Sequence, residues 1–195
     1  MNRTTRTLQL VTGFAALVGA PAMMIVGFVM FGTFAAAQFR IYDMTTDYAA
    51  GVIAGLVLLV LTFFWPVPAA HRRALLLLWL LRVGVTLGAM LPYEALYGLD
   101  ATGYYVGGKA LNDPVALLEF GQGTQNIRAL VGLLSNITES YSALKVIFSY
   151  VGLIAVYIFY RAAAVCLGQD RIVMLYALGL LPSLLFWSSI LGKDP

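Results

Sequence analysis

The feature that most constrains this chain is a series of five apolar runs, each long enough or nearly long enough to cross a bilayer as a helix. They occupy residues 8–37, 48–65, 74–91, 141–165 and 172–191. A spanning helix needs about 20 mainly apolar residues, and only 11% of the 195 residues are charged, against about 25% in soluble domains. The chain is therefore predicted to be an all-α, polytopic transmembrane helical bundle of about five spans, forming a single membrane domain over residues 1–195.

The first apolar run is interpreted as one retained span. It holds the 30 residues from 8 to 37, whereas the apolar core of a signal peptide has about 7–15 residues and two spans need about 40. Pro21 lies inside the run, and a proline removes a backbone hydrogen bond and bends a helix. We therefore expect one long, kinked or tilted helix that stays in the mature chain.

Prolines and glycines predict how the other runs end and how they pack. Pro92 follows the third run directly, so we expect that helix to stop there. Gly51 with Gly55, and Gly84 with Gly88, are Gly-x-x-x-Gly pairs. Such pairs allow two helix backbones to approach closely within a membrane, which predicts helix–helix contacts at both.

Basic residues alternate between the two ends of the spans and so orient them. One end carries Arg3, Arg6, His71, Arg72, Arg73, Arg161 and Arg171. The polar segment 93–140 lies at the other end, with Lys109 and Arg128 outnumbered by five carboxylates. By the positive-inside rule we expect a cytoplasmic N-terminus and an outward, periplasmic segment, in a multi-pass protein of the bacterial inner (plasma) membrane. His71, in the cytoplasmic turn, is expected to be solvated.

The outward segment 93–140 is predicted to contain short helices. Asp113-Pro114 is typical of an N-cap followed by proline at the first helical position. Between residues 125 and 134, apolar side chains recur at i, i+3, i+4 and i+7. These are amphipathic helices of a kind suited to lying along a membrane surface, so the lipid bilayer is an expected partner.

Asp100, about eight residues after the third span, is the candidate catalytic residue. A carboxylate at the membrane rim can act as a general base or share a metal. The alternative is a solvated loop aspartate that only shapes a turn. Tyr104 and Tyr105 follow it; they are either interfacial belt residues or a platform for a sugar.

Three cationic residues are candidates for binding a substrate phosphate. Arg82 lies nine residues from both Arg73 and Leu91, about 13 Å from either end of its helix, so it must face a carboxylate, a carbonyl or a polar cavity inside the bundle. Lys145 begins the fourth span, where snorkelling to headgroups is the alternative. Lys193 follows the fifth.

Nucleic acid is not an expected partner, and nucleotide binding is not supported. The sequence pI is about 9.1, but the 12 Lys and Arg residues are dispersed at the ends of apolar runs rather than gathered in a basic patch. Gly192-Lys193-Asp194 lacks both the earlier glycine and the following Ser or Thr of a phosphate-binding loop.

Two stretches resemble a known family. Asp100-Ala101-Thr102-Gly103-Tyr104-Tyr105, just outside a span, resembles the start of the first large outer loop in GT-C-type polytopic membrane glycosyltransferases. The stretch from Leu181-Pro182-Ser183 through Phe186-Trp187 to Gly192-Lys193-Asp194 resembles a segment of bacterial members described as ArnT-like or dolichyl-phosphate-mannose-mannosyltransferase-like. The resemblance covers about residues 75–194.

This resemblance implies a membrane enzyme that transfers a sugar from a polyprenyl-phosphate donor to a glycan or lipid acceptor. Asp100 would be the general base or would share a divalent metal, although Ala101 stands where a second acid often follows. Because the family has more spans, we expect this chain to be the N-terminal part of a longer protein. Two alternatives stay open, namely a non-catalytic subunit or scaffold of envelope polysaccharide assembly and, on Arg82 alone, part of a transporter.

Overall fold

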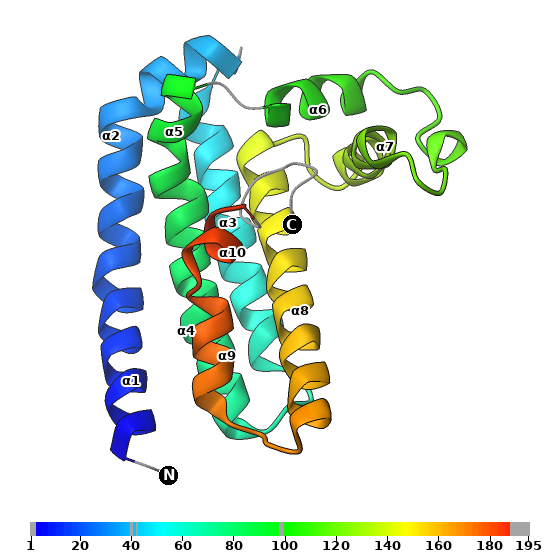
Figure 1. Ribbon diagram of the computed structural model, residues 1–195. Helices are drawn as coiled ribbons and strands as arrows, with labels where there is room; N and C mark the ends of the chain where they lie inside the picture. The colour runs from blue at the N-terminus through cyan, green and yellow to red at the C-terminus, as the bar shows by residue number, and fades with distance from the viewer. Residues whose placement is uncertain (1–2, 40, 42, 98–99, 188–195) are drawn as a thin grey trace.

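The protein is a bundle of long helices with a smaller helical lobe at one end (Figure 1). The computed structural model describes residues 3–39, 41, 43–97 and 100–187, and within these ranges it contains helices and no strand. Four helices in these ranges are long and apolar enough to cross a membrane: Arg3–Ala37, Met44–Phe63, Ala69–Tyr97 and Tyr141–Leu167. The predicted all-α membrane bundle is therefore confirmed.

The first apolar run forms one continuous rod, as expected. It consists of α1 (Arg3–Phe14), the π-helical turn η1 (Ala15–Gly19) and α2 (Ala20–Phe39). The π turn lies directly before Pro21, whose ring would clash with the carbonyl four residues earlier in a regular α-helix. An extra residue in the turn relieves such a clash inside a membrane helix.

Helix α3 (Met44–Phe63) starts before the predicted residue 48 because Asp43 caps it. One oxygen of the Asp43 carboxylate accepts hydrogen bonds from the backbone N–H groups of Thr45 and Thr46, both at 3.1 Å. Such a cap satisfies amides that have no partner within the helix. The hydroxyl of Thr46 also donates to this carboxylate, which lowers the pKa of Asp43.

The third span does not stop at Pro92, so that prediction was wrong. The span is built from α4 (Ala69–Gly84), the π-helical turn η2 (Val85–Ala89) and α5 (Met90–Tyr97). As at Pro21, a π turn comes shortly before the proline and accommodates its ring. The span therefore carries on to Tyr97, and Glu94 becomes part of it.

Helix α8 (Tyr141–Leu167) is the fourth long helix, and it ends at Gly168 in the left-handed conformation (φ 62°). The fifth apolar run is not continuous within the described residues. It forms α9 (Ile172–Gly179) and α10 (Pro182–Trp187), separated just before Pro182. A proline cannot continue the preceding hydrogen-bonding pattern, which explains the break.

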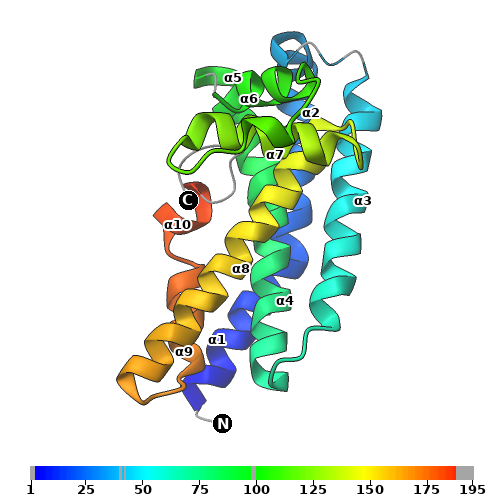
Figure 2. The same ribbon diagram turned by 90° about the vertical axis from the view of Figure 1, so that its right-hand side faces the viewer.

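The predicted short helices of the polar segment form a lobe that projects sideways from the bundle, at the end opposite the N-terminus (Figures 1 and 2). They are α6 (Asp100–Lys109), the 3₁₀ turn η3 (Val115–Leu117) and α7 (Gly123–Ser135). Asp113 caps η3 as predicted, accepting from the amides of Val115 and Ala116. Buried side chains of α6 and α7 join Met90, Leu91 and Leu144 of the bundle in one apolar cluster.

Both glycine pairs lie at close helix contacts, as predicted. A Cβ atom on Gly84 would lie 2.6 Å from the Cβ of Ala20, and one on Gly88 would lie 2.6 Å from the backbone of Met23. These contacts hold α2 against α4 and η2. On α3, a Cβ on Gly51 would lie 2.8 Å from Ser142 of α8.

Candidate functional site

Asp100 stands at the first turn of α6, where α5 passes into the lobe, and it is exposed. An acidic residue in the first turn interacts favourably with the helix dipole, so the residue has a structural use as well as a chemical one. The carboxylate nevertheless meets solvent at the outer rim of the bundle. It can therefore accept a proton from a hydroxyl group that approaches from that side.

The two tyrosines after Asp100 are held within the lobe. Tyr104 is buried in the apolar cluster shared with the bundle. Tyr105 is half-buried; its hydroxyl donates to the backbone carbonyl of Glu139, and its ring lies 5.2 Å from the ring of Tyr141. Of the two, only Tyr105 has surface that a ligand could contact in this arrangement.

Lys145 of α8 forms a buried ion pair with Glu94 of α5 and does not reach the surface. The lysine Nζ lies 2.8 and 3.0 Å from the two carboxylate oxygens, and the side chains are 2% and 0% exposed. The same Nζ lies 5.0 Å from the centre of the Tyr141 ring. A charged group inside a membrane bundle is stable only with such a partner. Glu94 was missed from the sequence because it follows Pro92, where we expected the helix to have ended.

Asp47 of α3 adds a second carboxylate at this end of the bundle. It accepts hydrogen bonds from the amides of Tyr141 and Ser142 at 2.7 and 3.1 Å, and from the Ser142 hydroxyl at 2.6 Å. It thereby caps α8 and fixes α3 to it. Asp47, Glu94 and Lys145 thus connect three spans at the end of the bundle that carries the lobe.

Arg82 lies inside the bundle, as its central position in the span predicted. Its side chain is fully buried on α4, one turn before Thr86, which is also buried. The described part of the fifth run packs nearby, since α10 contacts η2. Lys193 lies outside the described residues.

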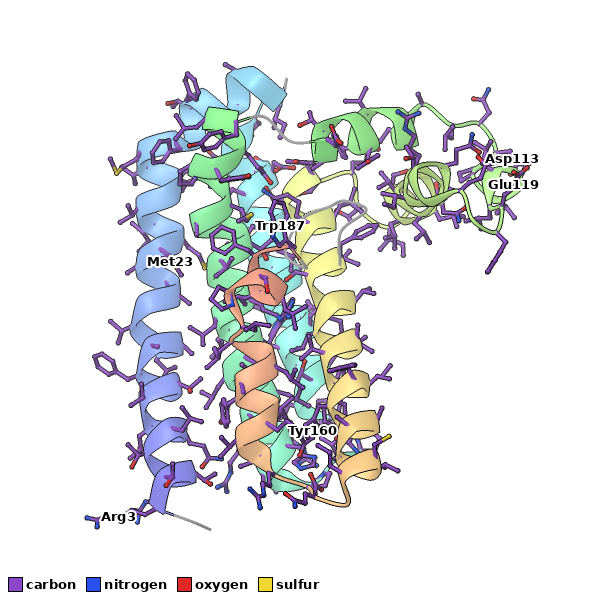
Figure 3. The ribbon with its side chains drawn as sticks, in the orientation of Figure 1. Arg3, Met23, Asp113, Glu119, Tyr160 and Trp187 are labelled. Carbon is purple, nitrogen blue, oxygen red and sulfur yellow. The ribbon has the colours of Figure 1, made fainter. Side chains whose placement is uncertain are left out.

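The α10 part of the second stretch that carries the family resemblance lines a small hollow on the bundle, facing the end of the third span. Tyr93 of α5 lines it from one side, and Pro182, Ser183, Phe186 and Trp187 of α10 from the other. Its volume is about 260 Å³. Figure 3 shows Trp187 midway along the bundle, in front of the long helices. The ring of Tyr93 lies next to that of Tyr97 at the end of α5, with ring centres 5.0 Å apart.

A second polar cluster lies at the opposite end of the bundle, around His71, near the labelled Tyr160 in Figure 3. His71 is buried rather than solvated, so that prediction was wrong. Its Nδ1 lies 3.2 Å from the Tyr157 hydroxyl, and its Nε2 lies 3.2 Å from both the Tyr160 hydroxyl and an Asp170 oxygen. The turn was misjudged because α4 already starts at Ala69, which directs the imidazole against α8.

The hydrogen-bond directions in this cluster follow from counting protons. The Tyr160 hydroxyl donates to Asp170, so the hydrogen between Tyr160 and His71 must be carried by Nε2. Nδ1 then accepts from Tyr157 when the ring is neutral. The Tyr160 hydrogen bond is the main reason that the pKa of Asp170 is lowered, with the charges of His71 and Arg161 as smaller contributions.

Neither cluster forms a recognisable metal site. Within the residues that the structure describes, no three His, Cys, Asp or Glu side chains gather closely enough to hold a metal ion.

Comparisons with known proteins identify no relative of this chain. No protein-family model, no curated protein sequence and no solved structure matches it. The functional argument therefore rests on the residues and on their geometry.

Proposed function

We propose that the chain is a membrane glycosyltransferase, or the N-terminal part of one, that transfers a sugar from a polyprenyl-phosphate donor to an envelope glycan or lipid. The reaction would take place at the periplasmic face of a bacterial inner membrane. The observation that carries the proposal is the exposed Asp100 carboxylate at the junction of α5 and the lobe. It stands seven residues after Tyr93, which lines the aromatic hollow with Trp187.

Each residue has a defined role in this proposal. Asp100 removes the proton from the acceptor hydroxyl as that oxygen attacks the sugar. Arg82 or Lys193 holds the donor phosphate, and Tyr105 contacts the sugar. Because Lys145 is held by Glu94, its contribution is to position the end of α5 and hence Asp100. The resemblance in the sequence favours the role of Asp100.

Deletion of the gene, followed by complementation, tests this proposal whichever sugar is transferred. Mass spectrometry of the envelope glycans should show a sugar missing from the deletion strain. The Asp113→Asn variant should restore it, because Asp113 is an exposed lobe carboxylate whose capping role asparagine can also fill. The Asp100→Asn variant, present in the membrane at the same level, should not restore it.

The alternative function is a non-catalytic subunit or scaffold of envelope polysaccharide assembly. One observation favours it: the two described cations that we expected to bind phosphate, Arg82 and Lys145, are 0% and 2% exposed. In the same experiment a scaffold gives a different result. The deletion would still alter the glycan, but Asp100→Asn would restore it as well as Asp113→Asn does, which would refute the catalytic role.

A further inference from the structure

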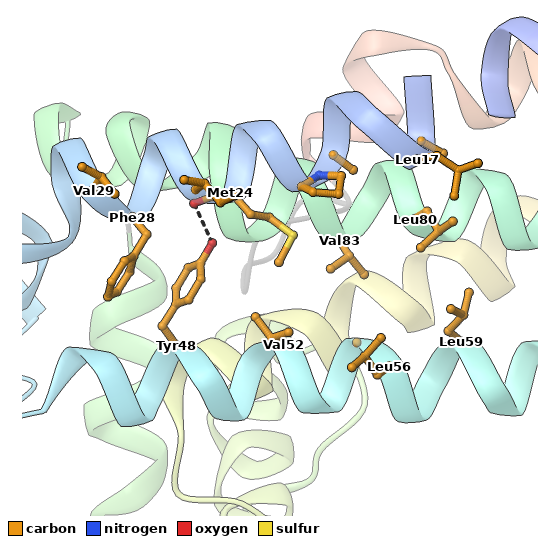
Figure 4. Close-up of a pocket in the computed structure, with 15 residues that line it drawn as sticks. Leu17, Met24, Phe28, Val29, Tyr48, Val52, Leu56, Leu59, Leu80 and Val83 are labelled. Carbon is orange, nitrogen blue, oxygen red and sulfur yellow. Dashed lines mark hydrogen bonds between the residues drawn. The ribbon is translucent and has the colours of Figure 1, made fainter. Parts of the chain in front are cut away.

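An apolar groove lies between α2 and α3, two helices that the family resemblance does not cover (Figure 4). Its volume is about 470 Å³. Leu17 and Met24 line it from the first rod, Val52 and Leu56 from α3, and Val83 of α4 lies between them. Protein interiors are close-packed with few voids, so an apolar space of this size needs an occupant.

The groove exists because its two walls pack mainly on other helices and little on each other. Helix α2 is drawn onto α4 and η2 by the close contacts of Gly84 with Ala20 and of Gly88 with Met23. Helix α3 is instead held to α8, where Gly51 meets Ser142. The first rod is also irregular beside the groove, since the η1 turn contributes Leu17 to the lining. The two walls meet where Tyr48 contacts Met24 and Phe28, and the groove continues beside Val52 and Leu56.

The lining is almost entirely apolar. Among the described residues around the groove, only Tyr48 has a polar side chain. Its hydroxyl lies 2.7 Å from the carbonyl oxygen of Leu87 and 3.0 Å from that of Met24, and its ring lies 4.6 Å from the Phe28 ring. The hydroxyl hydrogen is already used, which leaves the Tyr48 oxygen as the one side-chain acceptor in the lining, so a polar occupant would lose more hydrogen bonds with water than it gains.

The position and length of the groove fit one acyl chain. Its rim includes Ile25, Val29 and Leu56, which are 64%, 72% and 57% exposed, so the groove is continuous with the surface that four membrane-spanning helices turn towards lipid. From Leu17 to Val29 it follows twelve residues, about 18 Å of helix, close to half of the roughly 30 Å hydrocarbon thickness. A chain from one leaflet covers this length.

We propose that the groove binds one acyl chain of a membrane phospholipid as a held, structural lipid. This inference goes beyond the proposed sugar transfer and does not depend on it. The bound chain supplies the apolar contacts that α2 and α3 do not make with each other.

Photolabelling of the intact chain tests the inference. The protein is reconstituted in nanodiscs of phosphatidylethanolamine and phosphatidylglycerol, with a diazirine on one acyl chain, and labelled peptides are mapped by mass spectrometry. Peptides of α2 and α3 should be labelled several-fold more than the lipid-facing side of α8, where Ile158 has a similar exposure of 62%. Val52→Trp should fill the groove and remove the excess, whereas Ile158→Trp should leave it unchanged.

Two results would overturn the inference. One is equal labelling of the α2–α3 face and the α8 face, which would mean that the groove contains freely exchanging bilayer lipid and no held lipid. The other is found with a bifunctional protein cross-linker in the same nanodiscs. A cross-link between α2 or α3 and a second copy of the chain, without excess lipid label, would mean that the protein itself covers the groove. If Val52→Trp does not fold, the smaller Val52→Phe serves in its place, and an undiminished excess would count against the proposal.

Discussion

At the scale of single residues, the buried charges separate what a sequence can indicate from what it cannot. The central position of Arg82 was sufficient to place it inside the bundle, because an arginine in mid-span cannot face lipid cheaply. The partner of Lys145 was not predictable, since Glu94 lies 51 residues away and pairs with it only when α5 packs against α8. The local exposure of Asp100 and its place at the start of a helix are likewise visible only in the structure.

Removing one partner of the Glu94–Lys145 pair should destabilise the protein strongly, because the other charge is then left buried and unpaired. Glu94→Met or Lys145→Met alone leaves an unpaired buried charge and should cost about 3–5 kcal/mol, whereas the double Met variant should lie much closer to the unsubstituted protein. Unfolding by SDS in mixed micelles measures this. Glu139→Gln is the matched control, because the Lys109–Glu139 pair is exposed at 3.7 Å and should contribute less than about 1 kcal/mol. Single variants as stable as the control would contradict the prediction.

The Asp170 cluster should make stability depend on acid pH. The folded state lowers the pKa of Asp170, so its contribution is present above the unfolded value of about 3.9 and is lost as the pH falls through the lower folded value. The stability advantage of the unsubstituted protein over Asp170→Asn should therefore shrink as the pH is lowered from 5. Tyr160→Phe should remove most of this dependence, because the Tyr160 hydroxyl is its main cause. An advantage that stays constant down to pH 3 would contradict the assignment.

At the scale of elements, neighbouring residues in the sequence predicted a helix cap correctly but did not predict where a span ends. Asp113 caps the following segment as predicted, because capping depends on neighbours two or three residues away, but the expected short helix is only the 3₁₀ turn Val115–Leu117. The same local reasoning failed at Pro92, where the η2 turn lets the helix carry on to Tyr97. A π turn depends on packing around the helix, here against α2, and so leaves little trace in the sequence.

Replacing two different glycines by alanine should change the stability of the protein in opposite directions. In Gly88→Ala the new Cβ would lie 2.6 Å from the Met23 backbone, and such overpacking should destabilise the bundle by about 1–3 kcal/mol. In Gly103→Ala, where nothing lies within 4 Å of the new Cβ, the lobe helix should gain about 0.5–1 kcal/mol. Thermal unfolding in detergent compares the two. A neutral Gly88→Ala would show that α2 does not pack this closely on η2.

At the scale of the whole molecule, the lobe and the N-terminus lie at opposite ends of the bundle (Figure 1). The sequence predicted this arrangement, because three long apolar runs separate the N-terminus from the lobe, and an odd number of spans places two segments at opposite ends. The sideways projection of the lobe was not visible in the sequence. It follows from α6 and α7 packing on each other, with Gly108 of α6 close against Val131 of α7.

The proposed orientation predicts a simple accessibility pattern. In a Cys166→Ala background, Gln125→Cys in the lobe should react with a membrane-impermeant maleimide in intact bacterial cells whose outer membrane admits the reagent. Gln169→Cys, which follows α8 at the other end, should react only after the inner membrane is permeabilised. Both positions are exposed. The reverse pattern would show an inverted protein, and equal labelling of both would contradict a spanning bundle.

The sequence by itself determined the class of this protein, an all-helical membrane bundle with a polar lobe at one end. It could do so because hydropathy over about 20 residues and capping over a few are properties of neighbours in the chain. Tertiary structure alone decided which groups meet: Lys145 with Glu94, His71 with Asp170, and α2 with α3 at Tyr48 but not along the groove. Those outcomes depend on how whole helices pack. Glycine contacts and buried charges that lie far apart in the chain determine which helix faces pack together and which face lipid.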